Sequence, residues 1–188
     1  NFKKKSKLPK KTNNELIKLV EKKIGFELTL DQINAIKEIN SDLTSKERMF
    51  RILQGDVGSG KTIVSLITSY NTIINEYQVA FMAPTEILAK QHFKLFLKVF
   101  GRKFNSELLT GKTEYKKRLD IVKNLENKKI DIIFGTHALF QQKIKFKNLG
   151  LIVIDEQHKF GVNQRKKLSE KGGTNCDVLV MSATPIPR

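Results

Sequence analysis

The stretch "LQGDVGSGKTIVSL" at residues 53–66 places three glycines, a lysine and a threonine between two apolar runs. It fits the pattern G-x-x-x-x-G-K-[ST], with Gly55, Gly60, Lys61 and Thr62 at the defining positions. Glycine permits backbone torsions that other residues avoid, so successive N–H groups can turn inward around phosphate oxygens. The N-terminus of the helix that follows adds a partial positive charge at the same point. The stretch therefore predicts a phosphate-binding loop between a strand and a helix.

This loop supplies the candidate nucleotide-binding residues. Lys61 is expected to meet the β- and γ-phosphates of a nucleotide, and the Thr62 hydroxyl is expected to ligate Mg²⁺. The whole set runs along the loop into the first turn of the helix: Gly55, Asp56, Val57, Gly58, Ser59, Gly60, Lys61 and Thr62.

Short apolar runs alternate with segments of helical length from residue 49 onward. The runs are "FRIL" (50–53), "QVAFMAP" (78–84), "SELLT" (106–110), "DIIFGT" (131–136), "GLIVIDE" (150–156) and "DVLVMSA" (177–183). Such runs, separated by helical segments, indicate βαβ units and an α/β fold, with a predominantly parallel sheet and helices on both faces. Before them, residues 13–25 and 28–43 have the pattern of amphipathic helices, the second capped by Thr29 or Asp31.

A pair of acidic residues ends one of these runs. "LIVIDEQH" at 151–158 reads as a buried strand that ends in Asp155 and Glu156. Ligands of a parallel sheet bind outside the carboxyl ends of its strands, where the phosphate loop also lies. We therefore expect Asp155 to hold the magnesium through water and Glu156 to accept a proton from the hydrolytic water. His158, two residues further on, is placed to sense the γ-phosphate.

The composition fits one globular domain and leaves its partner open. The chain has 188 residues and a net charge of +16, which favours a polyanion such as nucleic acid. A lysine-rich bias from an AT-rich genome would give the same charge. The single cysteine and the lack of a signal peptide favour a cytoplasmic location. Residues 1–14 are expected to be a basic linker or frayed terminus, and residues 15–188 the domain, with the chain a piece of a longer protein.

Several blocks together resemble a known helicase family. "DEQH" (155–158) is a DExH-type motif of superfamily-two helicases, and "SAT" (182–184) is similar to their motif III. Five blocks resemble the RecG family of branch-migration DNA helicases: "GDVGSGKT" (55–62), "MAPTEILAKQH" (82–92), "GTHALFQ" (135–141), "DEQHKFGVNQR" (155–165) and "ATPIPR" (183–188). The resemblance covers about residues 26–188. It implies the first RecA-like, P-loop NTPase motor domain of an enzyme that uses ATP and Mg²⁺ on branched DNA in recombination and repair.

The resemblance also implies roles for further residues. Gln32 would read the adenine, with Phe26 nearby, while His158, Ser182 and Thr184 would couple ATP hydrolysis to DNA movement. The implied contacts with the DNA backbone are Pro84, Thr85, Thr110, Gly111, Gly135, Thr136 and His137. Threonine hydroxyls and free N–H groups at these loop starts suit phosphate contacts that carry no sequence information.

Other functions remain open at this point. The family's wedge domain and second RecA-like domain, with its arginine finger, are not in this sequence, so the chain alone is expected to be nearly inactive. The related transcription-repair coupling factor shares some of these blocks. A small GTPase would need N-K-x-D, and "NKKID" (127–131) is one residue too long. A non-catalytic, basic DNA-binding module is the third alternative.

Overall fold

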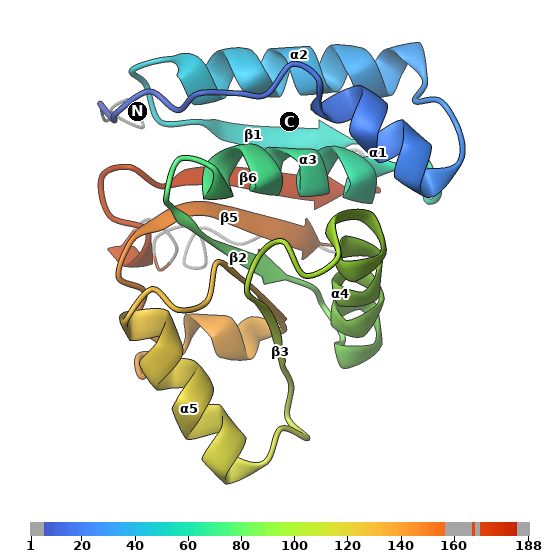
Figure 1. The fold of residues 1–188 in the computed structure, drawn as a ribbon. Helices are drawn as coiled ribbons and strands as arrows, with labels where there is room; N and C mark the ends of the chain where they lie inside the picture. Colours follow the sequence, from blue (N-terminus) through green and yellow to red (C-terminus); the bar gives the residue numbers. More distant parts are fainter. Residues whose placement is uncertain (1–5, 157–166, 168–169, 184–188) are drawn as a thin grey trace.

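The computed structural model describes residues 6–156, 167 and 170–183 (Figure 1). Within them, six parallel strands form one sheet in the order β1-β6-β5-β2-β4-β3. The strands are β1 (Phe50–Gln54), β2 (Gln78–Met82), β3 (Ser106–Leu109), β4 (Ile132–Gly135), β5 (Leu149–Glu156) and β6 (Asp177–Ser182). Each strand lies on one of the apolar runs, and the prediction of an α/β fold with a parallel sheet is confirmed.

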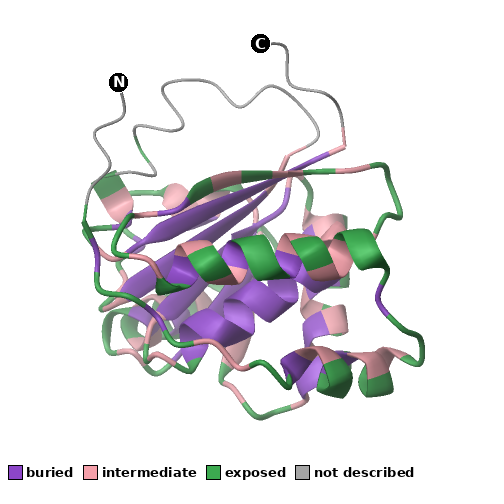
Figure 2. Ribbon diagram, turned by 90° about the horizontal axis from the view of Figure 1, so that it is seen from above, coloured by how far each residue is buried: buried purple, intermediate pink, exposed green. Residues whose placement is uncertain are grey.

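Helices cover both faces of this sheet. The described helices are α1 (Leu16–Ile24), α2 (Leu30–Thr44), α3 (Lys61–Ile73), α4 (Glu86–Phe100), α5 (Tyr115–Glu126) and the short 3-10 helix η1 (His137–Phe140). Side chains of α1 to α4 pack with Val79 and Phe81 of β2, whereas α5 and η1 pack with Ala80 and Met82 on the other face. β2 is therefore buried on both sides, which explains its uninterrupted apolar run, and the central strands are coloured as buried in Figure 2. No helix in the described part of the chain is long and apolar enough to cross a membrane.

The start of α2 is fixed by a reciprocal pair of hydrogen bonds. The Thr29 hydroxyl accepts from the backbone N–H of Gln32, and Gln32 Oε1 accepts from the backbone N–H of Thr29. This capping box confirms Thr29, one of the two predicted caps. It also holds the Gln32 side chain at the N-terminal end of α2, beside the phosphate loop.

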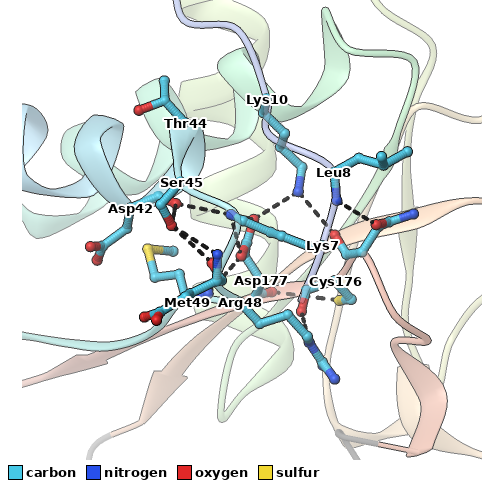
Figure 3. A network of polar contacts seen from close by, with 12 residues as sticks. Lys7, Leu8, Lys10, Asp42, Thr44, Ser45, Arg48, Met49, Cys176 and Asp177 are labelled. Carbon is cyan, nitrogen blue, oxygen red and sulfur yellow. Dashed lines mark hydrogen bonds and ion pairs between the residues drawn. The ribbon is translucent and has the colours of Figure 1, made fainter. Parts of the chain in front are cut away.

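The segment before α1 is packed against the domain. Lys7 and Lys10 are 6% and 2% exposed, and both ammonium groups bind the carboxylate of Asp177 at 2.8 and 2.7 Å (Figure 3). Backbone hydrogen bonds from Lys7 to Lys46 and from Lys10 to Leu43 hold the segment along α2. The expectation of a solvated segment is wrong for these two lysines, because the start of β6 offers them a buried acidic partner. The boundary between residues 1–14 and 15–188 remains a prediction.

The same network surrounds the single cysteine. Cys176 is buried directly before Asp177, and its carbonyl accepts a hydrogen bond from Arg48 Nε at 2.8 Å. Burial raises the pKa of the Cys176 thiol to about 12. The thiol is therefore protonated at neutral pH and has a packing role in this structure.

Candidate functional site

The phosphate loop joins the end of β1 to the first residue of α3. Gly58 and Gly60 have φ values of 82° and 80°, in the left-handed region that glycine enters without a steric penalty. The backbone N–H of Gly55 donates to the carbonyl of Ser182 at 3.1 Å, which fixes the loop to the end of β6. Among the described residues, no side chain caps the N-terminus of α3. The first-turn N–H groups and the helix dipole are thus available to an anion.

Lys61 is the first residue of α3, and its side chain lies against this loop. Its ammonium donates to the carbonyls of Gly55 and Asp56 at 2.5 and 2.8 Å, and lies 3.4 Å from Ser59 Oγ. A compact ammonium with three donors can exchange such carbonyls for phosphate oxygens without leaving the loop. The geometry therefore fits the predicted contact of Lys61 with the β- and γ-phosphates.

Gln32 is in direct contact with the loop. Its side-chain Nε2 donates to the carbonyl of Ser59 at 2.9 Å, while its Oε1 is held by the α2 cap. A side chain at Gly60 would collide with the Gln32 amide. The Gln32 side chain thus connects the start of α2 to the phosphate loop. Phe26, a few residues before it, is 59% exposed. Adenine recognition by Gln32 remains a prediction.

The acidic pair lies at the same edge of the sheet as the loop. In the strand register Glu156 is opposite Ser182, and Ser182 is opposite Gln54, the last residue of β1. Asp155 and Glu156 are both half-buried. One row of paired residues therefore crosses three strands: Gln54 of β1, Ser182 of β6 and Glu156 of β5. The phosphate loop follows directly after Gln54.

His92 is a member of this site that the sequence analysis missed. It lies on α4, is 7% exposed, and its Nε2 is 2.7 Å from Asp155 Oδ2. No described residue bonds to Asp155 Oδ1, so this oxygen is available to a water molecule on a metal ion. Two sequence signals were present. His92 ends the block "MAPTEILAKQH" that resembles RecG, and it lies between Ala89 and Phe96 on the apolar side of α4, which is typical of a core residue.

The candidate DNA contacts lie on the other half of the same edge. Pro84 and Thr85 follow β2, Gly135 to His137 end β4 and begin η1, and Thr110 and Gly111 follow β3. The Thr85 hydroxyl caps α4 by accepting from the N–H of Leu88 at 3.2 Å. The backbone N–H of Gly111 donates to Glu86 Oε1 at 2.6 Å. The expectation of a free N–H is thus wrong for Gly111, because the carboxylate of α4 reaches across to it.

The candidate residues therefore divide the sheet edge into two halves that meet between β5 and β2. The candidate nucleotide residues lie on β1, β6 and β5 and on the loops that follow them, while the candidate DNA contacts follow β2, β4 and β3. Ser182, at 6% exposure, lies between the phosphate loop and β5. The predicted coupling residues His158 and Thr184 lie outside the described residues.

The predicted magnesium ligands are Thr62, directly after the phosphate loop, and Asp155, near the end of β5. Thr62 is half-buried in the first turn of α3, and Asp155 keeps one carboxylate oxygen without a bonding partner in the described part of the chain. A hydroxyl and a carboxylate are oxygen ligands of the kind that Mg²⁺ prefers. The residues present therefore fit a magnesium ion that is bound together with phosphates.

Comparison with curated proteins finds close relatives among DNA helicases. The chain is 52% identical over 191 residues to the ATP-dependent DNA helicase RecG of Aquifex aeolicus, a match that covers 98% of this chain. It is 51% identical over 166 residues to the RecG of Staphylococcus aureus, which covers 88% of this chain. The chain spans 24% of the length of each of these relatives.

Solved structures show the same fold. The structure of RecG bound to a three-way DNA junction matches with a TM-score of 0.83 and 43% identity, over 97% of this chain and 24% of that one. The UvsW helicase of bacteriophage T4 matches over 85% of this chain and 53% of that one, with a TM-score of 0.62 and 17% identity, which supports the fold alone. The expected RecA-like fold and the resemblance to RecG are confirmed. Residues 29–188 match the DEAD/DEAH box helicases, and the chain belongs to that family.

Proposed function

We propose that this chain is the first motor domain of an ATP-dependent DNA helicase that processes branched DNA in recombination and repair. The observation that carries the proposal is the arrangement of Lys61 and Asp155. Lys61 begins α3 inside a glycine-turned loop, and Asp155 ends β5 at the same edge of the sheet. RecG relatives at about half identity, and a RecG structure with a three-way DNA junction, support the same function.

Each residue of the nucleotide half has a defined task in this proposal. The loop N–H groups and the N-terminus of α3 bind the phosphates, and Lys61 neutralises their charge. Mg²⁺, when bound, would supply further charge neutralisation at the phosphates, held by Thr62 and, through water, by Asp155. Glu156 accepts the proton of the hydrolytic water. Gln32 contacts the adenine from the α2 cap.

The DNA half contacts the backbone without reading sequence. The threonine hydroxyls at the ends of β2, β4 and β3 suit phosphate oxygens, whereas the N–H of Gly111 is already bonded to Glu86. A net charge of +16 supports a polyanionic partner. His158, Ser182 and Thr184 couple the two halves. Because RecG relatives are about four times as long as the match, we propose that a wedge domain and a second motor domain act with this one.

The alternatives receive less support. Asp131, which would end a guanine-reading motif, directly precedes β4 and therefore lies at the amino edge of the parallel sheet, opposite the phosphate loop. The relatives near half identity are RecG proteins, which favours a RecG-like helicase over a coupling factor. A non-catalytic module would have no use for the loop and the acidic strand end together. We propose a cytoplasmic location, in keeping with the single free cysteine.

The proposal is tested by nucleotide binding to the chain and to Lys61→Ala. We expect the affinity for a fluorescent ATP analogue with Mg²⁺ to fall by about 10- to 100-fold, because a charge-assisted hydrogen bond contributes about 1.5–3 kcal/mol. Lys37→Ala is the matched control, since it removes an exposed lysine from α2. Undiminished binding by a folded Lys61→Ala variant would show that the loop is not the phosphate site.

A further inference from the structure

The histidine of α4 forms a side-chain link between the two halves of the sheet edge. His92 belongs to the helix that follows β2, in the DNA half, and it bonds to Asp155 at the end of β5, in the nucleotide half. We propose that His92 is a positioning residue, which orients the Asp155 carboxylate toward the Mg²⁺ of bound ATP. This inference rests on the proposed function.

The contact is a directed hydrogen bond in a restricted site. An ionised carboxylate only accepts, so the Nε2 of His92 carries the hydrogen and donates to Asp155 Oδ2 across 2.7 Å. The imidazole ring packs against Phe81 with a centroid distance of 5.1 Å and an interplanar angle of 45°. With 7% of its surface exposed, the ring has little room to turn away. The donor is therefore fixed in place before any ligand arrives.

Asp155 needs such a partner because its backbone alone does not orient its oxygens. The pairing of Asp155 with Met181 fixes the main chain at the end of β5. The side chain can still rotate about χ1 and χ2, and rotation moves the oxygens relative to Thr62 on α3. A bond to Oδ2 removes this freedom and leaves Oδ1 for a metal-bound water. Partners of metal-binding carboxylates act in this way, and their loss typically weakens metal affinity by about 10- to 100-fold.

Two substitutions separate the hydrogen bond from the packing of the ring. His92→Phe keeps an aromatic ring against Phe81 and removes the donor. His92→Gln removes the ring and places an amide N–H close to the position of Nε2. A third variant, His92→Asn, has an amide too short to reach Asp155, and it replaces His92→Phe if that protein does not fold.

The experiment measures how strongly Mg²⁺ supports nucleotide binding. A fluorescent ATP analogue is titrated into the 188-residue chain at a series of Mg²⁺ concentrations and in EDTA. For His92→Phe we expect the Mg²⁺ concentration at half-effect to rise by about 10- to 100-fold. His92→Gln should restore most of this loss. In EDTA, both variants should bind the analogue as tightly as the unchanged chain does, because the side chain of His92 bonds to Asp155 and not to the phosphate loop.

Each outcome has a separate meaning. A folded His92→Phe variant with the Mg²⁺ curve of the unchanged chain overturns the positioning role and leaves the proposed function standing. A His92→Gln variant that is as weak as His92→Phe overturns the hydrogen bond as the cause. Failure of the unchanged chain to bind the analogue overturns the proposed function, and the inference with it. Lys61→Ala serves as the reference, because it should lose affinity both with Mg²⁺ and in EDTA.

Discussion

Gly58 and Gly60 have nearly the same backbone torsion but different surroundings. Their φ values are 82° and 80°, so alanine at either position meets the penalty of the left-handed region, about 1–2 kcal/mol. A side chain at Gly58 meets nothing within 4 Å, whereas one at Gly60 collides with the amide of Gln32. We therefore expect Gly60→Ala to lower nucleotide affinity more than Gly58→Ala at a similar loss of thermal stability. Analogue binding and thermal unfolding of both variants provide the measurement.

The double variant Gly60→Ala with Gln32→Ala identifies the cause. If the collision with Gln32 matters, adding Gly60→Ala to a Gln32→Ala chain should lower its affinity by no more than Gly58→Ala lowers that of the unchanged chain. Equal affinity for the two single variants would contradict the claim that Gln32 holds the shape of the loop.

For single residues, the sequence predicted those that belong to a short motif of consecutive residues. Lys61 and Thr62 follow from the spacing of the loop. Thr29 was one of two predicted caps, and the capping box with Gln32 in the structure decides between them. His92 and Glu86 could not be predicted in this way. Their partners, Asp155 and Gly111, lie on other strands, and only the packing of α4 across the sheet brings them together.

Strands and helices followed from local patterns, while their order in the sheet did not. Each apolar run is long enough to become a strand, and the first three segments between them are long enough to become the helices α3, α4 and α5. The position of β6 between β1 and β5 depends on contacts distant in sequence, which no local pattern encodes. The error at Lys7 and Lys10 has the same origin, because Asp177 lies far along the chain from both. A lysine run near a terminus is usually solvated, and here a distant carboxylate buries two of its members.

The attachment of this segment depends on Asp177. Its carboxylate accepts from Lys7, Lys10 and the backbone N–H of Met49, and its side chain is fully buried (Figure 3). Asp177→Asn would leave two buried ammonium groups without a counter-charge. We expect a loss of about 3–5 kcal/mol in the free energy of unfolding, measured by urea denaturation.

Lys7→Met is the matched variant on the other side of this contact. Two ammonium groups share one carboxylate, and burial lowers the pKa of Lys7 because desolvation outweighs the attraction of Asp177. Methionine removes the excess charge and leaves the pair of Lys10 with Asp177, so we expect a change of less than about 1 kcal/mol. A loss as large as that of Asp177→Asn would mean that Lys7 is required as a cation.

Over the whole molecule, the described candidate residues of the strands and their loops lie along one edge of one sheet. Nucleotide candidates line β1, β6 and β5, DNA candidates line β2, β4 and β3, and the bond between His92 and Asp155 crosses the boundary. This division follows from the strand order, since β5 and β2 are neighbours although they are distant in sequence. A motor needs two such sites close enough to influence each other. The two proposed sites lie on neighbouring strands, on a scaffold whose central strands are buried.

The chain alone should bind ATP weakly and hydrolyse it far more slowly than a full-length relative. It carries the phosphate loop, Thr62 and Asp155, but spans 24% of the RecG of Aquifex aeolicus. The proposed second motor domain would supply an arginine to the γ-phosphate, and such an arginine contributes about 10³–10⁵ in rate. We therefore expect steady-state ATP hydrolysis by the chain to be at least about 10³-fold slower than by that relative, with or without branched DNA. DNA binding should be weak, independent of sequence and reduced by salt, because it depends on backbone contacts. The measurement is ATP turnover of both proteins side by side, with a three-way junction as the DNA. Turnover by the chain that rises on adding the junction to near the rate of the relative would show a complete active site within this domain.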